Sequence, residues 1–325
     1  EEIAPFVQTV GLFVNESPIQ FLGVDQLETD AGTKITIGDG GLFSQPMQNI
    51  LNADEPYEYG SCQNRLSVVN TPAGVFWMSQ NQGKIFQLSG GIKEISLLDM
   101  KWWLASYLPY MLTVNFPTFE LTDNPVIGIG CQAIYDNENQ MVYFCKRDFE
   151  LRMDIQDVVT YVNEDNFLVN GIVPIKLGDP AYFRKASWTL SFDPKTNNWI
   201  SYHDWHPNLL LPGKNTFLSI LNDGIWLHNY VCNQYCNYYG VDYPFEVEYQ
   251  LSTGQEVNTL RSVQYQMEVY KYAPNCFDRY HVLDFNFDEA VIYNTEQVSG
   301  LLRLNLSPKN NPWGILAYPI INPTF

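Results

Sequence analysis

The stretch that decides the fold spans residues 187–203 and reads SWTLSFDPKTNNWISYH. Residues 188–193 alternate large apolar side chains with small or polar ones, which is the period-two pattern of a half-buried strand. Residues 193–198 carry turn chemistry, because Asp bonds the backbone ahead of it, Pro presets its own φ and Asn tolerates positive φ. Residues 199–203 alternate again, so the stretch predicts two antiparallel strands joined by a tight turn, as in a propeller blade or a sandwich hairpin.

Three more stretches place apolar strands on either side of a turn rich in Gly, Asn or Asp. They are residues 75–88, 126–145 and 217–228. The four turns are centred near residues 82, 138, 196 and 223, so their spacing is uneven and no strict repeat period is present. Further strands are expected at residues 35–37, 65–69, 245–249, 263–269, 281–287, 289–293 and 301–306.

The apolar period changes once along the chain. Between residues 100 and 107 the apolar positions recur at spacings of three and four, with Ser96 as the expected N-cap and Pro109 as the stop signal. The pattern predicts one amphipathic helix inserted between the hairpins, near residues 96–108.

The predicted fold class is therefore all-β, a β-propeller-like meander of short antiparallel hairpins with one inserted amphipathic helix. We expect residues 1–60 to form an irregular N-terminal segment and residues 61–325 to form the propeller-like domain. Residues 146–182 match neither period clearly.

Composition restricts the classes of partner. The net charge of −18 excludes binding to nucleic acid by counterion release, because that needs clustered Lys and Arg. Like-charge repulsion would still let an acidic surface line a passage through which DNA moves without adhering. Only 17% of the residues are charged, so much of the surface must be neutral or covered by partners.

Aromatic residues make up 15% of the chain, and such residues favour strands and dominate interfaces. We expect the hairpins to be held together by structural aromatics at Trp77, Phe86, Trp188, Phe192, Trp199 and Trp226. The six cysteines are scattered through a long chain, which indicates thiols of a protein made in the cytosol rather than a disulfide scaffold.

The chain has no apolar run long enough to span a membrane. It starts at Glu1 with neither an initiator Met nor a signal peptide. We therefore expect a processed product or a fragment of a longer chain.

Two groups of residues resemble metal ligands in type. His228, Cys232 and Cys236 lie four apart and supply three ligands of the right kind, but a fourth is not evident. His203 and His206 follow a strand and precede a proline, where aromatic packing is the better expectation. We expect no metal, no cofactor and no catalytic residue in this chain.

The sequence contains no clear motif for general acid-base catalysis either. Asp284, Asp288 and Glu289 lie near one turn and could serve a glycosidase, but solvated turn residues are the simpler interpretation. Residues 191–199 approach the Asp-box S-x-D-x-G-x-T-W of sialidase-type propellers, yet Lys195 stands where Gly belongs and Trp199 falls one residue late. The G-x-S-x-G, H-E-x-x-H, P-loop and Rossmann patterns are absent from the sequence.

Whole phrases of the chain resemble a family of phage tail proteins. They are SVVNTPAGVFW at 67–77 with GKIF at 83–86, the stretch at 187–207, NYYGVDYPFE at 237–246 and AVIYNTEQVSGL at 290–301. These phrases are similar to the tail stabilisation, or muzzle (tail nozzle), proteins of crAss-like podoviruses, and the resemblance covers most of residues 60–310. It implies a β-propeller on a chain much longer than this one, in a ring around the distal tail, with no catalytic residues.

The functional expectation is a structural virion protein that forms or stabilises the channel for DNA ejection. Its partners would be other copies of itself in a ring and other tail proteins such as the hub, fibres or adaptors, with DNA present only transiently. The expected location is the virion tail, assembled in the cytoplasm of the host bacterium. The alternative is a carbohydrate-binding or host-receptor-binding module, and a propeller glycosidase is the third possibility.

Overall fold

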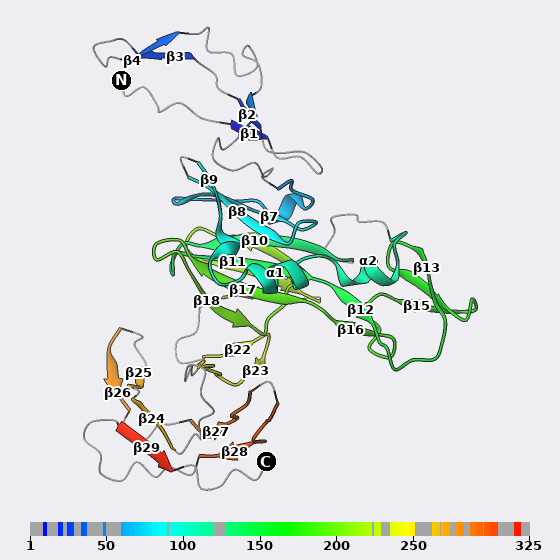
Figure 1. The fold of residues 1–325 in the computed structure, drawn as a ribbon, viewed down its shortest axis with the longest axis vertical. Coiled ribbons are helices and arrows are strands. Elements are labelled where there is room, and N and C mark those ends of the chain that lie inside the picture. Colours follow the sequence, from blue (N-terminus) through cyan, green and yellow to red (C-terminus); the bar gives the residue numbers. More distant parts are fainter. Residues whose placement is uncertain are drawn as a thin grey trace. The chain divides into compact units, whose positions relative to one another are not determined.

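We describe a computed structural model (Figure 1). It defines side chains at residues 60–89, 91–119, 128–222, 224–228, 235–250, 268–273, 277–282, 287–294 and 296–304, and the backbone of seven further strands. The chain divides into two compact units, Glu1–His228 and Asn229–Phe325.

The centre of the first unit is a four-stranded antiparallel sheet. Its order is β10 (Gly130–Asp136), β11 (Met141–Arg147), β17 (Trp188–Asp193) and β18 (Asn198–His203). The predicted hairpin at residues 187–203 is confirmed as β17 and β18, and its turn works as expected. The Asp193 carboxylate accepts the Lys195 N–H at 2.8 Å, and Asn197 takes a positive φ of 56°.

The half-buried pattern predicted for the first strand of this hairpin is wrong, because both faces of β17 are covered. Leu190 and Phe192 enter the main hydrophobic core on one face. On the other face, Thr189 is buried and its hydroxyl donates to the Trp205 carbonyl oxygen at 2.6 Å. The alternation therefore correctly indicates which face of β17 is apolar. The polar face is also buried, and its side chains are satisfied by hydrogen bonds.

A second four-stranded sheet consists of β6 (Val69–Thr71), β7 (Gly74–Ser79), β8 (Lys84–Leu88) and β9 (Ile92–Glu94). The predicted hairpin at residues 75–88 is confirmed by β7 and β8. The strand predicted at residues 65–69 is wrong over most of its length, because Arg65–Ser67 forms a 3₁₀ helix, η1. There the Ser67 hydroxyl donates to the Asn64 carbonyl oxygen at 2.7 Å, a local bond that competes with a strand.

The helical insertion differs from the prediction in number and in its start. The described residues contain two α-helices, α1 (Lys101–Tyr107) and α2 (Met111–Asn115), where one was predicted, and a 3₁₀ helix η2 (Ile95–Leu97) precedes them. Ser96 is not an N-cap, because its hydroxyl donates to Glu94 at 2.8 Å, inside η2. Pro109 falls between α1 and α2, where its ring interrupts the helical ladder as predicted.

Residues 146–182, which matched no pattern, form a β-rich lobe. β12 (Phe149–Leu151) pairs with β16 (Phe183–Lys185). A three-stranded sheet follows, with the order β13 (Val159–Asn163), β14 (Asn166–Val169) and β15 (Val173–Lys176). Phe167 and Ile175 from this sheet join the same core cluster as Phe192.

The remaining strands of the first unit form smaller sheets. The hairpin predicted at residues 217–228 is confirmed by β20 (Phe217–Leu221) and β21 (Gly224–Leu227), and β19 (Leu209–Pro212) completes that sheet. The strand predicted at 35–37 is confirmed by β4 (Lys34–Ile37), which pairs with β3 (Asp25–Glu28). The first strand of the chain, β1 (Thr9–Gly11), forms a sheet with β2 (Ile19–Phe21) and β5 (Gln48–Asn49).

The second unit is built from two-stranded pieces. The pairs are β22 (Asn237–Tyr238) with β23 (Val241–Asp242), β24 (Ser262–Gln266) with β29 (Ile315–Pro319), β25 (Tyr270–Tyr272) with β26 (Arg279–His281), and β27 (Glu289–Ala290) with β28 (Leu302–Arg303). These strands overlap parts of the stretches predicted at 263–269, 281–287, 289–293 and 301–306. The strand predicted at residues 245–249 is wrong, since that stretch pairs with no described strand.

The protein is thus mostly β-sheet, as predicted, with many short antiparallel hairpins. None of the sheets in the described part of the chain closes on itself, so the propeller remains a prediction. Among the described residues, no helix is long and apolar enough to cross a membrane.

Candidate functional site

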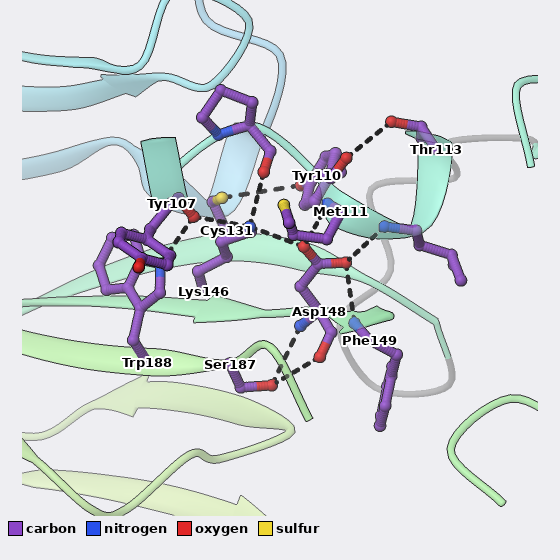
Figure 2. A network of polar contacts seen from close by, with 12 residues as sticks. Tyr107, Tyr110, Met111, Thr113, Cys131, Lys146, Asp148, Phe149, Ser187 and Trp188 are labelled. Atoms are coloured by element: carbon purple, nitrogen blue, oxygen red, sulfur yellow. Dashed lines mark hydrogen bonds and ion pairs between the residues drawn. The ribbon is translucent and has the colours of Figure 1, made fainter. Parts of the chain in front are cut away.

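A buried ion pair organises the junction between α1, α2 and the central sheet (Figure 2). Lys146, at the end of β11, places its Nζ atom 2.6 Å from the Asp148 carboxylate, and both side chains are fully buried. The same ammonium donates to the carbonyl oxygens of Tyr107 at 2.7 Å and Pro109 at 2.8 Å. The end of α1 is therefore tied to the sheet by a cation at the negative pole of the helix, where cations are favoured.

Asp148 holds the start of α2 in the same way. Its carboxylate accepts the backbone N–H of Met111 at 2.7 Å and of Phe149 at 2.8 Å. Burial, the largest influence, raises the pKa of the Asp148 carboxyl, and the Lys146 ammonium and the backbone donors oppose that effect. The network continues on the backbone of Asp148, whose N–H donates to the Ser187 hydroxyl at 3.1 Å and whose carbonyl oxygen accepts from that hydroxyl at 3.0 Å.

Two aromatic side chains complete the network. The Trp188 indole N–H donates to the Tyr107 carbonyl oxygen at 3.0 Å, beside the Lys146 bond (Figure 2). The buried Tyr110 hydroxyl donates to the Asn64 side chain at 2.7 Å, and burial raises its pKa well above the ordinary value. Strands, helices and the 3₁₀ segment are therefore joined by bonds whose partners lie far apart in the sequence.

This network positions an exposed aromatic surface, which we name the α1 aromatic face. It consists of Trp102, Trp103 and Tyr107 on α1 with Tyr202 on β18. The Trp103 ring lies 5.1 Å from Tyr107 and 5.3 Å from each of Tyr202 and Trp188, measured between ring centroids. Tyr107 and Tyr202 are at least half exposed and Trp102 is 81% exposed.

The side chains of the α1 aromatic face are suited to packing against another molecule. Rigid aromatic side chains bury a large area at a low entropic cost, and they are enriched at protein interfaces. Two described hollows lie elsewhere: one of about 320 Å³ between residues such as Gln87, Lys93 and Asn197, and one beside Arg152 and Met153.

The predicted structural aromatics fall into four environments. Trp77 and Phe86 stack at 5.4 Å in a small cluster of their own, and Trp188 and Phe192 lie in the main core. Trp199 is partly buried, with its ring 5.1 Å from Phe192. Trp226 lies on β21 and is partly exposed.

The metal candidates are not brought together by what the structure describes. His228 packs its ring 4.4 Å from Phe217 and its Nε2 atom lies 2.7 Å from the Ser219 hydroxyl oxygen. Cys236 belongs to the other unit, and Cys232 lies outside the described residues. The described part of the chain contains no group of three or more His, Cys, Asp or Glu side chains suited to a metal ion.

Of the other two candidate histidines, His203 packs against aromatic rings. His203 lies 5.3 Å from Tyr143 and 5.7 Å from Trp205, and its Nε2 atom is buried without a hydrogen-bond partner among the described residues. Burial lowers the pKa of His203, His206 and His228 to about 4 each. Of the candidate carboxylates, Asp288 and Glu289 are exposed and Asp284 lies outside the described residues.

Sequence patterns did not indicate the buried pair of Lys146 and Asp148. Burial of two charged residues at the end of a strand has no periodic signal, and the pair fell in the stretch that matched no pattern. The α1 aromatic face was visible only as a run of apolar residues with helical spacing.

The fold and the site together define a β-rich protein that is held together by aromatic packing and a buried polar network, with exposed aromatic side chains on α1 and β18. The model of the family described as Crassvirus muzzle protein matches residues 56–223, slightly more than half of the chain. The chain belongs to this family, which confirms the resemblance seen in the sequence and supports a structural role in the phage tail. No curated protein matches the chain.

Proposed function

We propose that the chain is a subunit of a ring at the distal end of the phage tail, the muzzle or nozzle, which forms or stabilises the channel for DNA ejection. Membership of the muzzle family supports the location in the tail. Heterologous contacts that close under cyclic symmetry generate rings from identical subunits. The ring subunit therefore needs two different contact surfaces.

The observation that carries the proposal is the α1 aromatic face. Trp102 projects from α1 with 81% of its surface exposed, and Tyr107 on the same helix is half exposed. Lys101 places its Nζ atom 5.6 Å from the centroid of the Trp102 ring, so a cation lies at the rim of the apolar surface. An aromatic centre with a polar rim is the usual anatomy of a protein interface.

The charge suits the role of a channel. The chain carries 36 acidic residues against 18 Lys and Arg, so a lumen lined by it would repel the DNA backbone. We expect an acidic lumen, and a basic lumen would contradict this part of the proposal.

The proposed partners are further copies of the chain in the ring and other tail proteins such as the hub, fibres or adaptors. DNA is present only in transit. We place assembly in the cytoplasm of the host bacterium and assign the chain no enzymatic activity and no cofactor.

A second function, binding of a carbohydrate or host receptor, draws on the same observation, since exposed Trp and Tyr rings also stack on sugars. A glycan panel with the purified chain tests it. A propeller glycosidase has less support, because neither described hollow is lined by two carboxylates.

Electron microscopy of purified virions or of the recombinant chain tests the main proposal. It predicts a closed ring around an axial channel, with Trp102 buried between subunits. A monomer with the aromatic face open to solvent would favour the glycan-binding function.

A further inference from the structure

Residues 245–249 have the composition of a strand. They read FEVEY, with Phe245, Val247 and Tyr249 alternating with two glutamates. This is the period-two pattern of a strand with one apolar face. The apolar side chains are not covered, since Phe245, Val247 and Tyr249 are 69%, 41% and 77% exposed.

The same residues form no ladder within the described chain. None of their backbone N–H or C=O groups is hydrogen-bonded to any described residue. Their described contacts are made by side chains: the rings of Phe245 and Phe287 stack at 6.4 Å, and the Tyr293 hydroxyl contacts the Glu248 carboxylate. A sequence that favours a strand is thus left without a partner strand.

The surroundings of this segment do not supply a core. The described sheets of the second unit are two-stranded, and none of its described side chains is buried. Isolated two-stranded ribbons are marginally stable in water. An open sheet edge would give the segment the backbone partners that the described part of the second unit does not supply.

We propose that residues 245–249 add as a fifth strand to the edge of β18 in a second copy of the chain. The inference rests on the proposed assembly of the chain into a ring, and it names the contact that joins neighbours. β18 is an edge strand of the four-stranded sheet and has six residues, with a bulge at Ile200, which has no partner on β17. Added strands bind through backbone hydrogen bonds, and their alternate side chains give specificity.

Side chains around β18 match the segment in polarity and charge. Ile200 and Tyr202 are at least half exposed on β18 and offer cross-strand partners to Phe245, Val247 or Tyr249. The exposed Lys195 lies in the turn before the strand and suits a glutamate of the segment. The acidic neighbours of the strand are Asp193, in the same turn, and Asp204, directly after the strand.

The first test compares Val247→Pro with Val247→Thr in the full chain, by light scattering over a concentration series. Proline removes a backbone N–H and fixes φ near about −65°, away from the φ of a regular antiparallel strand, whereas threonine keeps the N–H and a β-branched side chain. We expect the proline variant to need an about tenfold or higher concentration for half-assembly, which is the effect of about 1.4 kcal/mol, and the threonine variant to match the parent. Urea unfolding of the first unit should be unchanged in both variants.

If the parent chain assembles and Val247→Pro assembles equally well, the strand addition is wrong and the proposed ring survives. If the parent is monomeric at every concentration, both proposals fail.

The second test identifies the partner strand directly. A photo-crosslinking amino acid at position 247, in a mixture of ¹⁴N- and ¹⁵N-labelled chains, should give hybrid peptides that contain residues 198–203. Cross-links confined to single chains, or to a different peptide, would overturn the assignment to β18.

Discussion

The Lys146 ammonium lies 2.6 Å from the Asp148 carboxylate, and neither side chain is exposed. The two residues are two apart in the sequence, and each binds one helix. Lys146 donates to carbonyl oxygens at the end of α1, and Asp148 accepts from N–H groups at the start of α2. The orientation of the α1 aromatic face depends on this pair, because Tyr107 contributes both a ring to the face and a carbonyl oxygen to the network.

Removing the buried Lys146 cation should lower the free energy of unfolding far more than removing an exposed cation. Lys146→Met leaves Asp148 buried without its counter-ion, and breaking a buried pair in this way costs about 3–5 kcal/mol. The measurement is the free energy of unfolding in urea.

The matched control for that experiment is Lys176→Met. Lys176 forms an ion pair with Asp165 at 3.0 Å, but its side chain is mostly exposed, so a loss of at most about 1 kcal/mol is expected. Equal losses in the two variants would contradict the structural role assigned to Lys146.

Acid should destabilise the first unit through its buried histidines. The pKa of His203, His206 and His228 falls from 6.5 to about 4 in the folded chain. The unfolded chain therefore binds protons first, and the free energy of unfolding should fall as the pH drops from about 6.5 towards about 4. Nearby Asp204 and Asp136 oppose the shift, and Lys185 and the neighbouring histidine add to it.

Urea unfolding between pH 7 and pH 4.5 measures this slope. His203→Phe should reduce it by about one third, because one of three buried imidazoles is removed, while replacement of the exposed His281 by Gln should leave it unchanged. A slope that His203→Phe does not alter would rule out His203 as one of the groups responsible.

Gly74 should tolerate a methyl group poorly. Its φ is 119°, and an added Cβ atom would lie 2.1 Å from the Leu88 carbonyl oxygen. Gly74→Ala should therefore destabilise the chain by about 3 kcal/mol. Gly171→Ala, at a φ of 71° but with open space around it, should cost only about 1 kcal/mol. Thermal unfolding of both variants checks the difference, and a reversed order would show that the close contact at Gly74 is relieved cheaply.

Trp102 should matter for assembly and not for folding. Trp102→Ala removes an 81% exposed ring and should change the free energy of unfolding by at most about 0.5 kcal/mol while weakening assembly. Ile172→Ala is the control, because Ile172 is equally exposed but lies between β14 and β15. Light scattering should show weaker assembly for the Trp102 variant alone, and equal assembly of both variants would remove the α1 aromatic face from the interface.

Local rules were sufficient for the hairpins. Asp193 and Asn197 encode their turn by hydrogen bonding and positive φ within a few residues, and β17 and β18 follow from that turn. The same holds for β7 and β8, where apolar alternation and the positive φ of Gly83, at 65°, act locally.

Non-local contacts account for what the sequence did not predict. Lys146 binds carbonyl oxygens 39 and 37 residues away, so nothing in its own neighbourhood indicates that it is buried. The start of α1 at Lys101 rather than near Ser96 reflects the Ser96–Glu94 bond and the packing of η2 against β8. The propeller expectation came from the family resemblance and from hairpin rhythm, and neither specifies how sheets close.

The incorrect strand prediction at residues 245–249 has a different cause. The strand pattern of this stretch is clear, yet the described chain offers it no partner. If β18 of a second copy pairs with this stretch, the alternation correctly predicted a strand, and only its partner in the assembly was not predictable from the single chain.

The most direct test of the account is the mass and symmetry of the native assembly, measured by electron microscopy of purified virions. The account predicts a closed ring of identical subunits around an axial channel at the distal tail, with the α1 aromatic face covered by a neighbouring molecule. A chain that is present in the tail as isolated copies, with Trp102 and Tyr202 open to solvent, would contradict it.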